Sequence, residues 1–309
     1  MRLPKTVVTL MCTFAVATAG VNYQQVAQLK WYGANQNAGF AVGNGPIGVA
    51  FDGANIWVTN FMADSVTKLR AADGAVQGRF DTGHRPTGVA FDGANIWVAN
   101  EFSGSLTKLR ASDGANLGTF RVRDGLFGVA FDGTNIWVTN SYRQNVTRLR
   151  ASDGASLGTF GTGNVPWGIA FDGANIWVAN RLDNTVTKLR ASDGANLGTF
   201  STGSEPSAIA FDGANVWVVN QTGNTVTELR ASDGATLGTF NTGNGPDGVA
   251  FDGANIWVAN QSDGTMTKLR TSDGANLGTF SVGGAPFGVT FDGANIWVAN
   301  HTSNTVSKL

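Results

Sequence analysis

The sequence predicts an all-β protein, and more narrowly a seven-bladed β-propeller. The chain has 42 glycines in 309 residues, about twice the usual share, and only 14% charged residues, which is typical of short strands joined by tight turns. A motif, Phe-Asp-Gly-x-Asn-(Ile/Val)-Trp-Val, recurs every 40 residues. A period near 40 residues is typical of helical HEAT-type arrays or of propeller blades. The seven copies begin at Phe51, Phe91, Phe131, Phe171, Phe211, Phe251 and Phe291.

Four short segments of β propensity make up one repeat, as the copy from Pro166 to Gly203 illustrates. An Asp-Gly dipeptide, which tolerates the positive φ angles of a tight hairpin, joins the first pair and the last pair. Four antiparallel strands form a propeller blade, and seven blades close a ring. A helical array needs apolar residues three and four apart, which these glycine-rich segments lack. The expected strands are 168–171, 175–178, 185–190 and 197–200.

The second expected strand has apolar side chains on both faces, as in the segment from Asn175 to Val178. This pattern is expected when each blade packs between two neighbours. Burying one tryptophan removes about 150–250 Å² from water, worth roughly 4–6 kcal/mol. We therefore assign the seven repeated tryptophans to the core and not to a cofactor or sugar-stacking surface.

The two ends of the sequence predict how the ring closes. Residues 305–309 match a third strand, and residues 39–46 match the fourth strand and following loop of other repeats. The N-terminal segment should therefore complete the last blade, which removes open sheet edges. Residues 26–30 also resemble a third strand, but we favour the C-terminal copy in that place. This divides the chain into an N-terminal arm at 20–35 and a propeller at 36–309.

The first 19 residues differ from the rest of the chain. Arg2 and Lys5 precede an apolar run at 6–16, and small residues follow, which is the pattern of a secretory signal peptide. An uncleaved membrane anchor is the alternative, but the run is shorter than the roughly 20 residues that cross a bilayer. The only cysteine, Cys12, lies in this segment, so the mature chain would have neither disulfides nor a thiol nucleophile. We expect a secreted or periplasmic protein with no stable membrane insertion after cleavage.

The charge of the chain argues against a nucleic-acid partner. The net charge is −1, and Lys and Arg are spread at repeat spacing instead of forming a basic run. We expect a monomer whose partner is not a polyanion.

The repeat resembles those of bacterial propellers of the streptogramin-lyase-like, NHL and YVTN group. The shared patterns are Pro-x-Gly-(Val/Ile)-Ala-Phe-Asp-Gly-x-Asn-Ile-Trp-Val and a later Thr-Val-Thr-Lys-Leu-Arg, and they cover nearly all of the mature chain. The resemblance implies the architecture. It does not select an activity, because such repeats serve enzymes, binding modules and scaffolds alike.

The enzymes in this group that the repeat resembles are the streptogramin lyases. They open a cyclic depsipeptide by elimination, with a magnesium ion held by glutamates and a histidine base on the tunnel face. Several of their repeats end the second strand in glutamate, where this sequence has asparagine in all seven copies. A neutral amide does not replace a carboxylate as a charged magnesium ligand. The catalytic residues of the lyases are therefore not present at the matching positions of this sequence. We expect no cofactor; magnesium would be needed only if the protein were a lyase.

These seven asparagines are expected to cap the loops that follow them, and a ring of amides facing a ligand is the alternative. Similarly, the aspartates of the two constant turns are expected to bond nearby backbone rather than calcium. The asparagines are Asn60, Asn100, Asn140, Asn180, Asn220, Asn260 and Asn300.

Differences between the seven copies are confined to two loops. The two Asp-Gly hairpins barely change, whereas the loop after the second strand and the loop joining successive blades change in every copy. In a four-stranded blade these two loops lie at the same end. We therefore expect one constant face and one variable face, the latter surrounding the mouth of the tunnel.

Two positions fourteen residues apart in each repeat should be neighbours at this mouth. Trp167 and Arg181 form one such pair and are expected to stack as a cation–π pair. Aromatic residues at the first position suggest an apolar rim beside polar groups, which is typical of a ligand site. Unselected drift of exposed loops is the alternative. The candidate ligand-binding residues are Glu101, Phe127, Trp167, Arg181, Asp247, Phe287 and His301.

For catalysis, His84 and Glu101 are the candidates, because the repeat places both at the same end of the second blade. We favour, however, a binding propeller whose variable face contacts a protein, peptide or glycan. A lyase-like or hydrolytic enzyme with a site at the tunnel mouth is the first alternative. A passive envelope scaffold is the second.

Overall fold

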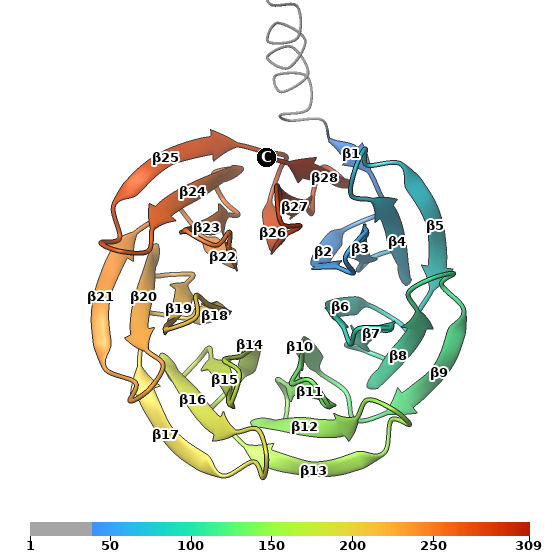
Figure 1. Ribbon diagram of the computed structural model, residues 1–309, viewed down its shortest axis with the longest axis horizontal. Coiled ribbons are helices and arrows are strands. Elements are labelled where there is room, and N and C mark those ends of the chain that lie inside the picture. Colours follow the sequence, from blue (N-terminus) through green and yellow to red (C-terminus); the bar gives the residue numbers. More distant parts are fainter. Residues whose placement is uncertain (1–38) are drawn as a thin grey trace, which may run out of the picture. The chain divides into compact units, whose positions relative to one another are not determined.

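Seven four-stranded antiparallel sheets surround a central tunnel in residues 39–309, the part of the chain that the computed structural model describes (Figure 1). The predicted seven-bladed β-propeller is confirmed. The expected signal peptide (1–19) and N-terminal arm (20–35) lie outside the described residues. Within 39–309 there is no helix of the length and hydropathy needed to cross a membrane.

Each blade runs from an inner strand at the tunnel to an outer strand at the rim (Figure 1). Blades 1 to 6 are β2–β5, β6–β9, β10–β13, β14–β17, β18–β21 and β22–β25, and blade 7 is β26–β28 with β1. The inner strands are β2 (Pro46–Phe51), β6 (Pro86–Phe91), β10 (Leu126–Phe131), β14 (Pro166–Phe171), β18 (Pro206–Phe211), β22 (Pro246–Phe251) and β26 (Pro286–Phe291). The second strands are β3 (Asn55–Asn60), β7 (Asn95–Asn100), β11 (Asn135–Asn140), β15 (Asn175–Asn180), β19 (Asn215–Asn220), β23 (Asn255–Asn260) and β27 (Ile296–Asn300).

The third and outer strands complete the blades. The third strands are β4 (Ser65–Arg70), β8 (Ser105–Arg110), β12 (Asn145–Arg150), β16 (Thr185–Arg190), β20 (Thr225–Arg230), β24 (Thr265–Arg270) and β28 (Thr305–Lys308). The outer strands are β5 (Val76–Asp81), β9 (Asn116–Arg121), β13 (Ser156–Gly161), β17 (Asn196–Ser201), β21 (Thr236–Asn241), β25 (Asn276–Ser281) and β1 (Phe40–Ala41). In blade 4 the first two strands extend two residues further toward the variable loops than expected, because Pro166 pairs with Asn180.

Strand β1 closes the ring. It pairs antiparallel with β28, placing Phe40 opposite Val306. The order β1-β28-β27-β26 confirms that the N-terminal segment supplies the fourth strand of blade 7 and that the C-terminal copy supplies the third. The Phe40 ring lies 5.5 Å from the ring of Trp297, in the contact that an outer-strand phenylalanine makes with a tryptophan in every blade.

The repeated tryptophans form the core, as predicted. Trp137 is fully buried and belongs to a cluster with Ile176, Val178 and Leu189 of the next blade, so each tryptophan joins two blades. Its indole Nε1 donates a hydrogen bond to Asp132 of the first Asp-Gly turn at 2.7 Å. The same turn bond recurs in all seven blades, and the turn aspartates also accept backbone N–H groups, as expected.

Glycine in the inner strands lets neighbouring blades approach closely at the tunnel. A Cβ atom on Gly168 would lie 2.3 Å from the carbonyl oxygen of Ser207 in the next blade, far inside van der Waals contact. Gly128 stands in the same relation to Trp167, at 2.5 Å. These glycines therefore set the tunnel diameter, and the side chains that precede them define its mouth.

A buried lysine on the third strand ties most blades to the next one. Lys188 donates to the carbonyl oxygens of Ala231 and Ser232 at 2.6 and 3.2 Å. In blade 5 the equivalent residue is Glu228, which cannot donate these bonds when ionised and instead accepts one from Asn215 at 2.7 Å. Burial, together with the nearby charge of Asp212, raises the pKa of Glu228. The contact between blades 5 and 6 therefore lacks the tie that Lys188 makes between blades 4 and 5.

Replacing Glu228 with lysine should stabilise the protein by about 1–2 kcal/mol, because the ammonium group would reach two carbonyl oxygens of the next blade. Thermal unfolding at neutral pH measures this. Glu228→Gln is the matched control: it removes the buried charge without adding the tie and should give a smaller gain. That gain should vanish below the ordinary glutamate pKa of 4.5, where Glu228 is protonated in both folded and unfolded chains, and grow above it. If the lysine variant is no more stable than the glutamine variant, the ammonium group does not stabilise the contact with the next blade.

Candidate functional site

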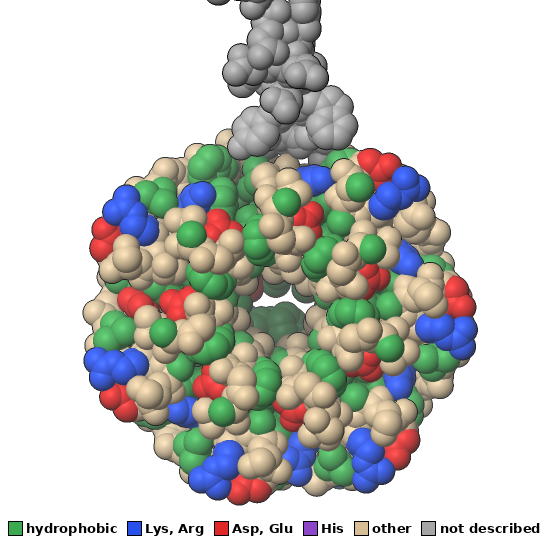
Figure 2. Space-filling model, viewed as in Figure 1, with side chains coloured by type: hydrophobic (Ala, Val, Ile, Leu, Met, Phe, Trp, Pro, Cys, Tyr) green, Lys and Arg blue, Asp and Glu red, His purple; other side chains and the backbone are tan. Residues whose placement is uncertain are grey.

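The two variable loops of each blade lie together at one end of the propeller, as predicted. The N–H of Phe61, after β3, donates to the carbonyl of Gly45 in the loop that precedes blade 1, at 2.9 Å. The N–H of Thr82, in the loop that leads to blade 2, donates to the carbonyl of Asp64 at 3.0 Å. The constant turns carry exposed Arg–Asp pairs such as Arg190 with Asp193. Figure 2 shows such basic and acidic side chains recurring in adjacent pairs around the rim of the ring.

The asparagines that end the second strands are structural. The amide oxygen of Asn180 accepts the N–H of Gly163, and its nitrogen donates to Thr185 and Thr187, all within 3.0 Å. All seven asparagines are completely buried, so the alternative of an amide ring facing a ligand is wrong. In six of them the amide oxygen accepts a loop N–H group, which confirms the expected capping there. Asn140 is the one of the seven whose amide lacks partners among residues 39–309; Arg123 stands where the other blades have the glycine whose N–H bonds the amide oxygen.

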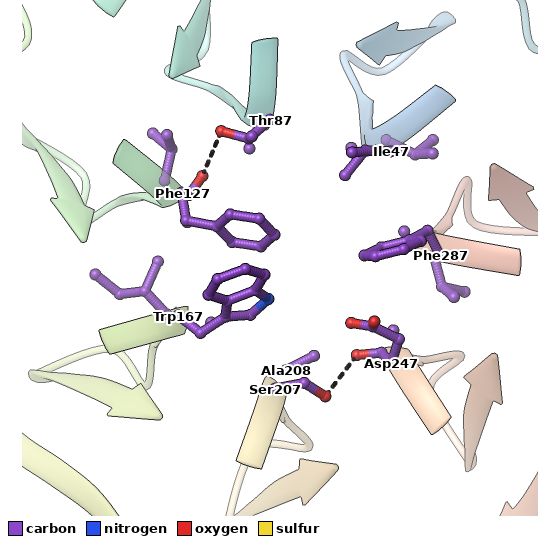
Figure 3. A pocket seen from close by; sticks show the side chains of 18 of the residues that line it. Ile47, Thr87, Phe127, Trp167, Ser207, Ala208, Asp247 and Phe287 are labelled. Carbon is purple, nitrogen blue, oxygen red and sulfur yellow. Dashed lines mark hydrogen bonds between the residues drawn. The ribbon is translucent and has the colours of Figure 1, made fainter. Parts of the chain in front are cut away.

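Seven side chains, one from each inner strand, form a ring in the tunnel (Figure 3). Below it lies a ring of small residues, six glycines and Ala208, and then a ring of valine and isoleucine, around a recess of about 190 Å³. The glycine and aliphatic rings are nearly seven-fold symmetric, whereas the first ring is not. Its members are Ile47, Thr87, Phe127, Trp167, Ser207, Asp247 and Phe287.

Aromatic residues occupy two opposite walls of this ring. Phe127 and Trp167 stack with ring centroids 3.5 Å apart, and Phe287 projects from the other side of the tunnel (Figure 3). The guanidinium carbon of Arg181 lies 4.9 Å from the Trp167 ring, so the predicted cation–π contact is present. The indole Nε1 of Trp167 is buried, has no hydrogen-bond partner among the described residues, and lies on the tunnel side of the ring.

A buried carboxyl group completes the ring. Asp247 is 4% exposed and points into the tunnel between Phe287 and Ser207 (Figure 3). Burial raises the pKa of Asp247 to about 7, although the charge of Arg181 and a hydrogen bond from Gln221 act in the opposite direction. A carboxyl with this pKa changes its charge near neutral pH.

Gln221 connects Asp247 to Arg181. Its Nε2 donates to Asp247 at 2.8 Å, and its Oε1 accepts from Arg181, which also forms an ion pair with Glu205 at 3.0 Å. Sequence reasoning missed Gln221 and Glu205 because it paired positions within one repeat. Gln221 lies 40 residues from Arg181, at the same position of the next blade, and this spacing was the available signal.

The remaining candidates lie around the same mouth. The His301 ring is 5.9 Å from Phe287 and 6.5 Å from Phe61, and its Nδ1 is buried without a partner among the described residues. Glu101 accepts a hydrogen bond from Tyr142 at 3.1 Å. The structure thus places Phe287 and His301 together, as expected from their spacing, and gives Glu101 a partner from the next blade.

The catalytic candidates have separate partners. The Nδ1 of His84 lies 2.8 Å from a carboxylate oxygen of Asp64, on the preceding blade, and its ring packs against Phe102. Both members of the His84–Asp64 pair are about half exposed, and Glu101 contacts Tyr142 instead. Across residues 39–309, no three His, Cys, Asp or Glu side chains gather as a metal site.

A row of exposed apolar side chains lies on half of the variable face. At the second residue of the loop after the second strand, blades 5 to 7 have Thr222, Ser262 and Thr302, whereas the first four blades have large apolar residues that are 45–67% exposed. We call these four the apolar arc. Aligning this position across the repeats would have revealed it from sequence. The arc is Met62, Phe102, Tyr142 and Leu182.

These features define a seven-bladed β-propeller with a symmetric scaffold and an asymmetric tunnel mouth. Solved structures with this fold include a hydrazine synthase of Kuenenia stuttgartiensis, at a TM-score of 0.77 and 18% identity, with 86% of this chain and 95% of that chain covered. A streptogramin B lyase aligns at 0.75 and 18%, over 87% and 95% of the two chains. The virginiamycin B lyase of Staphylococcus aureus aligns at 0.73 and 19%, over 86% and 94%.

These likenesses confirm the architecture that the repeats imply. No family model matches the chain, and no curated protein matches it either. At this level of identity the three structures show the shared fold, and the chemistry of the site has to be argued from its own residues.

Proposed function

We propose that this protein is an extracytoplasmic binding propeller that presents its variable face to a peptide or protein ligand and needs no cofactor. The observation that carries the proposal is the apolar arc beside the tunnel mouth. Exposed Met, Phe, Tyr and Leu side chains at one repeated position mark an interaction surface, because aromatic residues and methionine are enriched at protein interfaces.

The recess at the centre of this face adds a place for an anchoring side chain. Hot spots of binding are side chains that fill desolvated pockets, surrounded by contacts that exclude water. Here the aromatic walls and the buried Asp247 would form the pocket, and the apolar arc would form part of the surround. A ligand that lies across the mouth and inserts one side chain uses both features. A glycan would leave the arc without apolar partners, which favours a peptide.

Replacing the apolar arc with the hydroxyl residues of the other blades should weaken peptide binding at least tenfold, a loss of about 1.4 kcal/mol. The variant carries Met62→Thr, Phe102→Thr, Tyr142→Ser and Leu182→Thr. We expect the fold to be kept, since blades 5 to 7 have threonine or serine at this position. The probe is a random peptide display library selected on the mature protein, and the Kd of selected peptides is then measured by biolayer interferometry.

The control variant replaces four exposed leucines on outer strands with threonine: Leu117, Leu197, Leu237 and Leu277. These substitutions remove four exposed apolar side chains from the outer strands, away from the variable face. Peptides that lose affinity to the arc variant and keep it for the control support the proposal. Equal binding to all three proteins, or failure to select any peptide, argues for a passive scaffold.

A lyase-like or hydrolytic enzyme is the second candidate, favoured by one observation. Asp247 has a pKa near 7 in a recess of a fold that streptogramin B lyase shares, and a general base works best with a pKa near the operating pH. The test is turnover of streptogramin B with added magnesium. Turnover that Asp247→Asn abolishes supports an enzyme, and His84→Ala and Glu101→Ala test the sequence-based candidates in the same assay.

A further inference from the structure

We propose that the group which enters the tunnel mouth is an organic ammonium, of the kind that a lysine side chain carries, held by the carboxylate of Asp247. This inference rests on the proposed function, because it names the chemistry that the same face would recognise. It follows from the charges around Asp247, from the walls of the recess and from an unpaired indole N–H.

The carboxyl group of Asp247 has no cation in hydrogen-bond contact among residues 39–309. Its polar side-chain partner is the neutral amide of Gln221, at 2.8 Å. Arg181, the nearest cation, already forms an ion pair with Glu205 at 3.0 Å. The ionised group of Arg181, Glu205 and Asp247 therefore has one net negative charge. Its buried member is Asp247, which is 4% exposed and lines the recess.

Other charged or titratable side chains near this carboxyl do not balance it. His301 approaches from blade 7 but lies on Phe287, at 5.9 Å between ring centroids. The hydroxyl of Ser207, on the neighbouring inner strand, donates to the backbone carbonyl of Asp247 at 3.0 Å. This hydroxyl is therefore not a donor to the Asp247 carboxylate. A buried carboxylate with one neutral donor has an uncompensated charge, and a cation placed within about 4–6 Å would favour its ionised form.

The walls of the recess suit the methylene part of such a ligand. Phe127 and Trp167 form one wall and Phe287 the opposite one, so a flexible alkyl chain would contact aromatic surface on both sides (Figure 3). The Phe287 ring projects beside the carboxylate and can add a cation–π contact with the ammonium (Figure 3). A ligand anion would meet the same carboxylate and is disfavoured.

The unpaired Nε1 of Trp167 is an independent sign of a ligand. Buried polar groups in folded proteins nearly always have a partner, and this N–H, on the tunnel side of the indole, has none among the described residues. A ligand with both an ammonium and a neutral acceptor, such as a peptide carbonyl, would satisfy Asp247 and Trp167 together. A lysine residue carries both groups, whereas a simple alkylamine carries only the first.

The experiment compares two capped amino acids by isothermal titration calorimetry on the mature protein. Nα-acetyl-lysine methylamide and Nα-acetyl-norleucine methylamide have similar shapes, and only the first has a charge. We expect the lysine compound to bind at least tenfold more tightly at about pH 8. At about pH 6 the ratio should fall several-fold, because Asp247 becomes protonated as the pH drops through about 7 while the lysine stays charged.

Asp247→Asn, a nearly isosteric change, should abolish the preference for the lysine compound and its pH dependence. Asp273→Asn, an exposed acid of a constant turn, is the control that changes the net charge equally. The pH dependence in the unmodified protein supplies the test should the Asp247 variant not fold. Equal binding of the two compounds, a preference unaffected by Asp247→Asn, or a preference unchanged between the two pH values overturns the inference.

Further measurements distinguish a free amine from a peptide lysine, and they distinguish this inference from the proposed function. Butylamine that binds as tightly as the lysine compound identifies a free amine, and weaker binding identifies a peptide lysine. Selected peptides that depend on the apolar arc but show no preference for lysine leave the proposed function standing and overturn this inference. If the lysine compound binds as expected but peptide affinity is unchanged in the apolar-arc variant, this inference stands and the proposed function is overturned.

Discussion

Replacing Phe40 with alanine should destabilise the propeller by about 3 kcal/mol and open its last blade. The ring of Phe40 packs on Trp297 of blade 7 at 5.5 Å and covers Gly74 of blade 1, where a Cβ atom would lie 2.1 Å from it. Removing an aromatic ring from such a contact costs about 3–5 kcal/mol, the lower end of which suits a half-buried side chain. Thermal unfolding followed by circular dichroism measures the loss.

Phe200→Ala is the matched control, because Phe200 makes the same contacts with Trp177 and Gly234. The packing loss should be similar, but β17 is six residues long and is held by the chain on both sides, whereas β1 is a two-residue strand. Hydrogen exchange should therefore accelerate at β28 in the Phe40 variant and stay slow at β16 in the control. Equal protection of these two strands would show that β1 does not hold the ring closed.

The second large effect is expected at the first Asp-Gly turn. Asp172→Ala should lower the free energy of unfolding by about 2–4 kcal/mol, because it leaves the indole N–H of the buried Trp177 and two backbone N–H groups without their acceptor. Urea unfolding measures this. Asp193→Ala, in the exposed second turn of the same blade, should cost much less, since Asp193 accepts from Ala195 and Arg190 in contact with water.

The same turn predicts acid sensitivity. Burial opposes ionisation of Asp172, but hydrogen bonds from Trp177, Asn175 and Ala174 outweigh it and lower the pKa below its ordinary value of 3.8. A lowered pKa means that the stabilisation is present above pH 3.8 and is lost as the pH falls through the folded value. The unmodified protein should therefore lose stability below that pH, and Asp172→Ala should lose less. A difference between the two proteins that does not shrink on acidification would contradict the assignment.

The fold could be predicted from sequence because every blade repeats its own local signals. The Asp-Gly turns, the apolar second strand and the 40-residue spacing lie within single repeats, so one copy predicts all seven. The strand ends were underestimated, since the pairing of Pro166 with Asn180 depends on the loops that meet there. The role of Asn180 as a loop cap could be predicted because capping hydrogen bonds are local.

The candidate site was predictable only in part. Trp167 and Arg181 were paired correctly because both belong to one repeat. The bridge from Arg181 through Gln221 to Asp247 runs across three blades, and no single repeat contains it. The charge state of Asp247 depends on its burial by neighbouring blades, which composition and spacing do not express.

The closure of the ring also has a consequence for the time at which the protein can fold. Strand β1 pairs residue 40 with residue 306, so blade 7 forms only after nearly the whole described chain has been synthesised. Contacts between distant residues cost loop-closure entropy and slow folding. The six other blades contain only sequential strands and can form as the ribosome delivers them. Blade 7 is therefore expected to form after the other six, and the ring closes only once residue 306 is available.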